Sequence, residues 1–180
     1  MTDTQAKNHY TVKWITVTAL FMALNVVMSS FGLPVPGGHL YLNDVVICTA
    51  AILLDPVGAF AVGGIGAFLG DFFFYPTPMV TSLIVHGLQA IVISLCTHKL
   101  FKDKNDGKGK PVLASTIGVT IGAVIMVVGY TIGRCFYASV EYAILKIPFQ
   151  ILQAAVGAVA GVIIVYKFGL KKLFDKLMNK

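Results

Sequence analysis

The sequence has few charged residues for its length. Of its 180 residues, 12% are Asp, Glu, Lys or Arg and 57% are hydrophobic, and the mean hydropathy is +0.82. A soluble domain is about a quarter charged and about half apolar. Water therefore cannot be the solvent for most of this surface, and the shortage of charge indicates an integral membrane protein.

Cysteine and catalytic motifs are also scarce. The three cysteines, Cys48, Cys96 and Cys135, are scattered in apolar contexts without a CxxC or Cys/His cluster, so the sequence predicts neither a disulfide framework nor a metal site. His86 has no second His or Cys at ligand spacing, and no Gly-x-Ser-x-Gly occurs. We expect no catalytic residues, no metal and no cofactor.

Nearly all the positive charge lies in three segments. The formal net charge is +6, which by itself would allow a nucleic-acid partner. The lysines, however, precede the first apolar run, fill one polar segment in the middle of the chain, and form the C-terminal tail, as expected of cytoplasmic segments. We read the charge as a topology signal and expect no nucleic acid. These lysines are Lys7, Lys13, Lys99, Lys102, Lys104, Lys108, Lys110, Lys167, Lys171, Lys172, Lys176 and Lys180.

Six apolar runs divide the chain. A helix needs about 20 residues to span a bilayer, and the second run is short, but an even number of crossings puts all three basic segments on one side. The polar start favours a retained first helix over a signal peptide. We predict one domain, residues 1–180: an all-α bundle of six transmembrane helices with both termini, and a basic loop at about 101–111, in the cytoplasm. The runs are Trp14–Ser30, Val45–Leu54, Val57–Phe74, Met79–Leu100, Val112 to about Val140, and Ile144 to about Phe168.

Glycines crowd the third run. Gly66 and Gly70 have the GxxxG spacing, which lets helices approach closely in lipid. A dinucleotide fingerprint would need glycine where Leu69 stands. Close packing is the favoured interpretation.

Polar residues of the apolar runs cluster toward the outside. The fourth run enters from the outside, so His86 lies ~10 Å deep with Gln89 one turn deeper. Two further stripes at helical spacing run through the fifth and sixth runs. Their members are Tyr130, Arg134, Tyr137 and Glu141 in the fifth run and Lys146, Gln150 and Gln153 in the sixth. The inner halves are almost wholly apolar, so we predict a polar pocket open outward, with the Pro/Gly loop 32–42 as a possible lid. The candidate substrate-binding residues are Tyr41, Asn43, Asp44, His86, Gln89, Arg134, Tyr137, Glu141, Gln150 and Gln153.

Each candidate has a structural alternative. Asn43 or Asp44 can be a helix N-cap, and Arg134 can extend to the surface. The glutamines of the sixth run can simply join helices. His86 can be a satisfied packing residue, and Asp71 can be an interfacial group or a partner of a nearby cation. Aromatic residues near the pocket suit a small planar ring or an interfacial belt; they are Phe72, Phe73, Phe74, Tyr75, Tyr137 and Tyr142.

Residues 19–46 and 50–90 resemble the substrate-binding S components of energy-coupling factor (ECF) vitamin transporters, and the similarity extends over nearly the whole chain. The branch it resembles is that of riboflavin, pantothenate and hydroxymethylpyrimidine or pyridoxine S components. The family's AxxxA pattern matches Ala19 and Ala23, which implies docking of the first helix on the T component; intramolecular packing is the alternative. The turn at residues 54–58 carries Asp55 where the family pattern has glycine, which puts any role of that turn in doubt.

The resemblance implies a multi-pass protein of a bacterial plasma membrane. Such a subunit binds its vitamin outside, assembles with a T component and two ABC ATPases, and topples to release the vitamin inside. This chain lacks GxxxxGK[ST], because Pro111 follows Gly109-Lys110. ATP hydrolysis would therefore belong to the partners, and the chain is not expected to be an enzyme. We expect hydroxymethylpyrimidine or pyridoxine as substrate, with pantothenate or riboflavin as alternatives; an autonomous carrier or channel is the rival class.

Overall fold

Long apolar helices dominate the structure. The computed structural model describes residues 12–36, 38–100 and 111–178. Five of its helical segments are long and apolar enough to span a bilayer: Val12–Ser29, Pro56–Phe74, Met79–Lys99, Pro111–Tyr137 and Val140–Lys167. The prediction of a helical membrane protein is thereby confirmed. Apart from Pro111, the predicted basic loop at about 101–111 lies outside the described residues.

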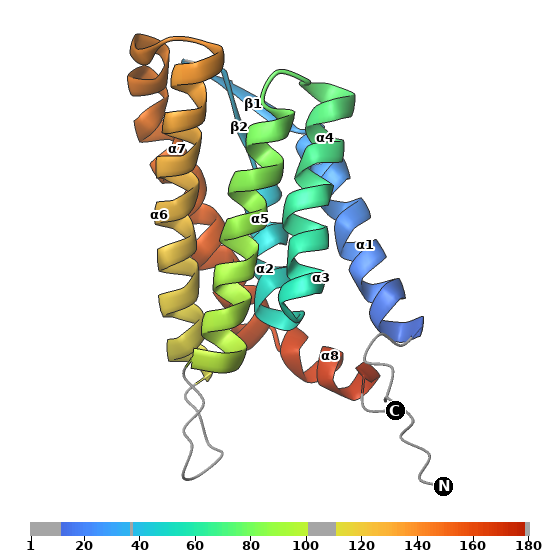
Figure 1. Ribbon diagram of the computed structural model, residues 1–180. Coiled ribbons are helices and arrows are strands. Elements are labelled where there is room, and N and C mark those ends of the chain that lie inside the picture. Colours follow the sequence, from blue (N-terminus) through green and yellow to red (C-terminus); the bar gives the residue numbers. More distant parts are fainter. Residues whose placement is uncertain (1–11, 37, 101–110, 179–180) are drawn as a thin grey trace, which may run out of the picture.

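The elements follow one another as a series of antiparallel helical segments with one β-hairpin near the start (Figure 1). The label η marks a short π-helical stretch that continues a neighbouring α-helix. In chain order they are α1 (Val12–Ser29), β1 (Gly32–Val35), β2 (Gly38–Tyr41), α2 (Asn43–Leu53), α3 (Pro56–Phe60), η1 (Ala61–Ile65), α4 (Gly66–Phe74), α5 (Met79–Leu95), η2 (Cys96–Leu100), α6 (Pro111–Tyr137), α7 (Val140–Val162), η3 (Ile163–Lys167) and α8 (Leu170–Met178).

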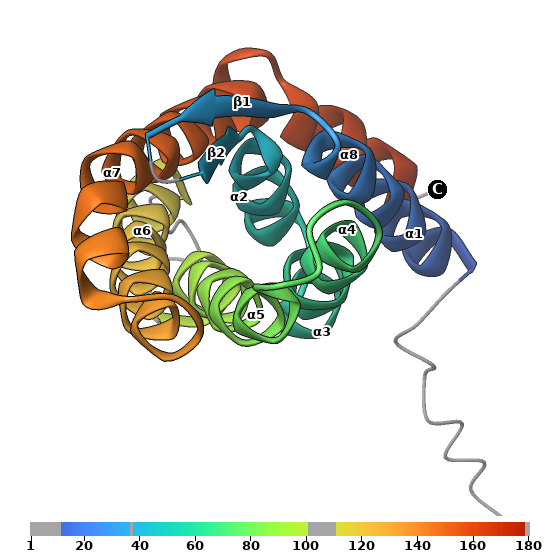
Figure 2. The same cartoon turned by 90° about the horizontal axis from the view of Figure 1, so that it is seen from above.

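The second predicted span is a short helix in the middle of the bundle. With 11 residues, α2 is about 16 Å long, roughly half of a bilayer core. Seen from above, α2 lies inside the ring formed by the other helices and the hairpin (Figure 2). All its residues except Val45 are buried. The chain approaches α2 as strand β2, so this segment is not a full-length spanning helix, and five candidate spans are found where six were predicted.

The predicted Pro/Gly loop is a β-hairpin. Strands β1 and β2 pair antiparallel from Gly32 opposite Tyr41 to Val35 opposite Gly38. Gly38 has φ +121°, a conformation that a residue with a side chain rarely adopts. Pairing satisfies the backbone groups of this segment where it lies against helices. We call the end of the bundle that carries the hairpin, and the α4–α5 and α6–α7 turns, the hairpin end (Figure 1).

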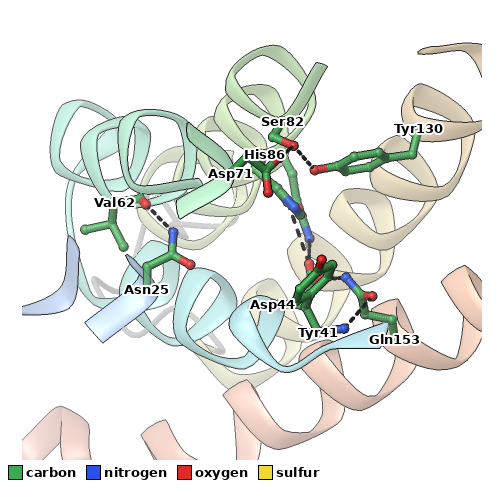
Figure 3. A network of polar contacts seen from close by, with 10 residues as sticks. Asn25, Tyr41, Asp44, Val62, Asp71, Ser82, His86, Tyr130 and Gln153 are labelled. Atoms are coloured by element: carbon green, nitrogen blue, oxygen red, sulfur yellow. Dashed lines mark hydrogen bonds and ion pairs between the residues drawn. The ribbon is translucent and has the colours of Figure 1, made fainter. Parts of the chain in front are cut away.

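Small residues allow close helix contacts, as the sequence predicted. A Cβ added to Gly70 would lie 2.5 Å from Oγ of Ser29 on α1, and one added to Gly66 would lie 2.8 Å from Nδ2 of Asn25. The Asn25 amide also donates to the carbonyl of Val62 in η1 at 2.7 Å (Figure 3). Close packing of the third run against α1 is therefore confirmed.

The turn between α6 and α7 comes earlier than predicted. We expected the fifth helix to reach about Val140, but α6 ends at Tyr137. Ser139 is the N-cap of α7, and its Oγ accepts the N–H of Tyr142 at 3.2 Å. Glu141 thus lies in the first turn of α7. The prediction that Glu141 continues the stripe of Arg134 and Tyr137 is wrong.

Asp55, which stands where the family pattern has glycine, has a structural role in its turn. Asp55 is the N-cap of α3, and its carboxylate accepts the backbone N–H groups of Val57 and Gly58, each at 3.4 Å. The same carboxylate accepts the indole N–H of Trp14 at 2.6 Å. Asp55 therefore joins the start of α1 to the start of α3.

Candidate functional site

A small polar cavity lies at the hairpin end, between the hairpin and α5, α6 and α7. Its volume is about 50 Å³, enough for one or two water molecules. Charged, amide and aromatic side chains from six segments of the chain meet there. The lining residues are Gly38, His39, Tyr41, Asn43, Asp71, Tyr75, Pro78, His86, Met126, Tyr130, Arg134, Tyr137, Tyr142, Lys146, Gln150 and Gln153.

A buried carboxylate organises the inner side of this cavity. Asp44, 1% exposed in the first turn of α2, accepts the Gln89 amide at 3.1 Å and the Gln153 amide at 2.6 Å (Figure 3). The other amide atom of Gln153, Oε1, accepts the backbone N–H of Tyr41 at 3.1 Å. One carboxylate thus links α2, α5 and α7, and through Gln153 it also links α7 to the hairpin. A buried charge needs such partners.

This network fixes the hydrogen on the His86 ring. Gln89 uses its NH₂ group toward Asp44, so its Oε1, 2.7 Å from Nδ1 of His86, must be the acceptor. Nδ1 then carries the hydrogen, and in a neutral ring Nε2 is an acceptor. The His86 ring meets the Tyr130 ring edge to face, with centroids 5.2 Å apart. His86 therefore presents its ring to Tyr130 at the cavity, with Nδ1 held in place by Gln89.

A second polar group joins the third, fourth and fifth predicted runs. Ser82 on α5 donates to the Asp71 carboxylate and contacts the Tyr130 hydroxyl (Figure 3). Since the Ser82 hydrogen is directed at Asp71, the Tyr130 hydroxyl donates to Ser82. The Arg134 guanidinium lies 5.4 Å from the centre of the same Tyr130 ring, a cation–π arrangement.

Two cations border the cavity without a carboxylate partner. Lys146 is 2% exposed and donates to the carbonyl of His39 on the hairpin at 2.5 Å. Arg134 is 9% exposed. Within the described ranges, no carboxylate oxygen lies within 4.0 Å of either cation. Each charge is therefore buried without an opposite charge in contact.

Several buried polar atoms at the cavity have no hydrogen-bond partner. Both amide atoms of Gln150, Nη1 of Arg134 and Oδ1 of Asn43 find none among the residues that the structure describes. Gln150 is 1% exposed. Buried polar groups are nearly always paired in folded proteins. These unpaired atoms, contributed to one cavity by α2, α6 and α7, are the arrangement expected of a ligand site.

Aromatic side chains supply the remaining walls. On the hairpin, the His39 ring lies 6.1 Å from the Tyr41 ring and 6.3 Å from the Tyr75 ring. Burial, and secondarily the charge of Asp71, raises the pKa of Tyr41 to about 12. The Tyr41 hydroxyl is therefore neutral at physiological pH and can act as a donor.

Seven of the ten predicted site residues line the cavity: Tyr41, Asn43, His86, Arg134, Tyr137, Gln150 and Gln153. Asp44 and Gln89 lie one layer behind, where they hold His86 and Gln153 in place. Glu141, in the first turn of α7, is exposed and lies outside the lining.

Other lining residues were not predicted as site members. Asp71, Tyr75, Tyr142 and Lys146 were noticed in the sequence but not assigned to the site. His39 was missed, and the alternation Gly-His-Leu-Tyr after a Pro-Gly-Gly turn is the strand signal that would have put His39 and Tyr41 on the same face.

The predicted docking residues lie away from this cavity. Ala19 and Ala23 are both exposed on α1, beside exposed Leu20 and Leu24. Seen from above, α1 is at the edge of the bundle (Figure 2). The two alanines are therefore on an outer surface, and packing inside the chain does not explain their small size.

Comparisons with known proteins agree on the type of chain. The family model for the S component of the ECF-type riboflavin transporter matches residues 9–171. An uncharacterized protein in the gap 3′ region of Pyrococcus woesei is 28% identical over 142 residues, which are 77% of this chain and 89% of that protein. The solved structure described as "Structure and mechanism of the S component of a bacterial ECF transporter" matches with a TM-score of 0.64. It covers 87% of this chain and 95% of its own, at 18% identity.

Proposed function

This chain belongs to the family of S components of ECF-type riboflavin transporters, and from that premise we propose that its cavity captures a small polar ring vitamin. An S component is the substrate-binding membrane subunit of a vitamin transporter and not an enzyme. The best candidates are pyridoxine and hydroxymethylpyrimidine, taken up from outside the cell.

The unpaired polar atoms in the cavity carry this proposal. Gln150 offers one donor group and one acceptor, Arg134 offers donors, and Asn43 offers an acceptor, all without partners in the described structure. Leaving a buried polar group unpaired costs about 1–3 kcal/mol. A ligand that pairs with several of them recovers that free energy on binding, which is a physical basis for tight binding.

The size and walls of the cavity favour a small ring. At about 50 Å³ it is far below the roughly 300–1,000 Å³ of pockets for drug-sized ligands, so a large substrate requires a larger rearrangement than a small one. Tyr75, Tyr137 and Tyr142 provide aromatic surface for stacking. The hydroxyl groups and ring nitrogens of pyridoxine or hydroxymethylpyrimidine match a wall that holds donors, acceptors and the Asp71 carboxylate.

Two alternative substrates each have an observation in their favour. Arg134 and Lys146 both line the cavity, and neither has a carboxylate partner in the described ranges. Two such cations suit the carboxylate of pantothenate. The description of the matching family names riboflavin. Either would be accepted by the same region, but riboflavin demands the greatest expansion of the cavity.

We infer that entry of the substrate involves the hairpin. Two side chains of α7 hold strand β2 by its backbone: Lys146 bonds the carbonyl of His39, and Gln153 bonds the N–H of Tyr41. These two contacts have to loosen if the hairpin is to move away from α7. The proposed opening is thus a hinge of the hairpin about its junctions with α1 and α2.

Transport requires partners, and the family implies which ones. We propose that the chain works with a membrane T component and two ABC ATPases, and that it docks on the T component through the exposed Ala19 and Ala23 of α1. Small residues one turn apart let a second helix approach closely. The proposed topology has the hairpin end outside, the opposite end in the cytoplasm, and the protein in the plasma membrane of a bacterium.

Binding and uptake measurements test this function. Purified protein is titrated by calorimetry with pyridoxine, hydroxymethylpyrimidine, pantothenate and riboflavin; we expect one of the two small rings to bind most tightly. Reconstituted alone in liposomes, the chain should not accumulate the bound vitamin, and adding the T component and ATPases with ATP should start uptake. Uptake by the chain alone would instead identify an autonomous carrier.

A further inference from the structure

The C-terminal helix α8 is strongly amphipathic and was not predicted from the apolar runs. Its nine residues follow Gly169, whose φ of +76° lets the chain turn sharply after η3. The helix lies across the end of the bundle opposite the hairpin (Figure 1). The last candidate span ends at Lys167 and α8 begins at Leu170. A helix that directly follows a candidate span is expected at the depth of the lipid headgroups.

Only part of the apolar face of α8 is covered by the bundle. Leu170 and Phe174 pack on the buried cores formed by α2 and its neighbours. Leu173 and Leu177, on the same helix one turn apart, remain 63% and 48% exposed. An exposed pair of leucines next to a membrane span is expected to enter the lipid interface.

The charged residues of α8 lie to one side of this exposed apolar pair. Lys171 is paired with Asp175 at 3.2 Å. Lys172 and Lys176, one turn apart and adjacent to the leucines, are exposed and have no ion-pair partner in the described part of the chain. A helical projection at 100° per residue places these two lysines between the leucines and the Lys171–Asp175 pair.

We infer that α8 is a binding surface for anionic lipid headgroups of the membrane leaflet opposite the hairpin end. Leu173 and Leu177 enter the upper acyl region, and Lys172 and Lys176 contact phosphate groups from the water side. Four lysines against one aspartate between Lys167 and Met178 make the segment cationic. Charge complementarity therefore selects anionic over zwitterionic lipid, and a protein partner is the alternative occupant.

A fluorescence experiment on the whole protein tests this inference. In a Cys135→Ser background, which leaves only the buried Cys48 and Cys96, an NBD label is placed on Leu173→Cys. The protein is reconstituted in nanodiscs of phosphatidylcholine with 0 to 30% phosphatidylglycerol and a headgroup-proximal doxyl quencher. We expect quenching to rise with the anionic fraction. One Lys contributes about fivefold to the equilibrium constant for binding at such a surface. Lys176→Gln should therefore lower the equilibrium constant for α8 binding to the membrane surface about fivefold, and Lys172→Gln with Lys176→Gln about 25-fold.

Lys99→Gln is the matched control, because Lys99 is also exposed but lies in η2. It should leave the quenching unchanged, and all variants should keep the melting temperature of the parent. Quenching that does not depend on phosphatidylglycerol, or that survives the double substitution, would overturn the inference. Loss of co-purification with the transporter partners in the double variant, with lipid dependence absent in the parent, would assign the surface to a protein instead.

Discussion

Replacing Gln150 by methionine should make the ligand-free protein more stable and bind its vitamin less well. Gln150 is 1% exposed, lines the cavity, and has a partner for neither amide atom in the described structure. Methionine has nearly the same length and shape but needs no hydrogen bonds. A residue kept only for packing would not show opposite effects on stability and binding.

The magnitude follows from the unpaired amide. A buried polar group without partners costs about 1–3 kcal/mol, so Gln150→Met should raise the free energy of unfolding by up to that amount. With about 2–4 °C per kcal/mol for a chain of this size, the melting temperature should rise by several degrees. Losing the same bonds in the complex should weaken the affinity for the vitamin by roughly 5- to 150-fold.

Gln153→Met is the matched control on the same helix. Gln153 has both amide atoms bonded, to Asp44 at 2.6 Å and to the Tyr41 N–H at 3.1 Å. Its replacement should lower the stability by about 2–4 kcal/mol. Both variants are compared by thermal unfolding in detergent without vitamin and by calorimetric titration with it. A Gln150→Met protein that is as destabilised as Gln153→Met, or that binds with unchanged affinity, would refute the reasoning.

Three further predictions concern other parts of the molecule. Arg134→Ala should abolish binding of an anionic vitamin, because a buried charge pair loses one partner at a cost of about 2–5 kcal/mol, but should weaken binding of a neutral ring about tenfold or less; unchanged titrations for all four vitamins would remove Arg134 from the site. Asp44→Asn leaves one of two donor amides facing an NH₂ group, so the free energy of unfolding should fall by about 1.5–3 kcal/mol, which thermal unfolding measures. An unaltered melting curve would contradict the described network. Ala19→Trp and Ala23→Trp should leave vitamin titrations intact and stop ATP-dependent uptake in the reconstituted complex, whereas lost binding would argue against docking.

Much of the helical framework could be predicted, because long apolar runs in a chain with little charge have few structural solutions. The boundaries that failed were those decided by local capping. The Ser139 cap starts α7 early and separates Glu141 from Arg134, and hydropathy does not register a single serine. The amphipathic α8 was missed because its leucines alternate with lysines and give no apolar run.

The region of the site could be predicted, but not which residues line the cavity and which lie behind the lining. Matching the depths of polar residues on the predicted helices brought seven lining residues together in advance. Depth alone cannot tell that Asp44 and Gln89 lie behind His86, since that depends on which side chains point at one another. The shortness of the second run was visible in the sequence, but the β-hairpin before α2 was not, because hydropathy does not register the strand pairing of residues 32–41.

Native mass spectrometry of the protein, purified from cells grown without added vitamins, is the decisive test of a vitamin site at the hairpin end. We expect one small molecule bound per chain, identified by fragmentation as a small ring vitamin or precursor, with a lower occupancy in the Gln150→Met and Arg134→Ala variants than in the parent protein. A folded protein that carries no ligand and binds none of the four vitamins, or a ligand retained equally by both variants, would contradict a vitamin site at the hairpin end.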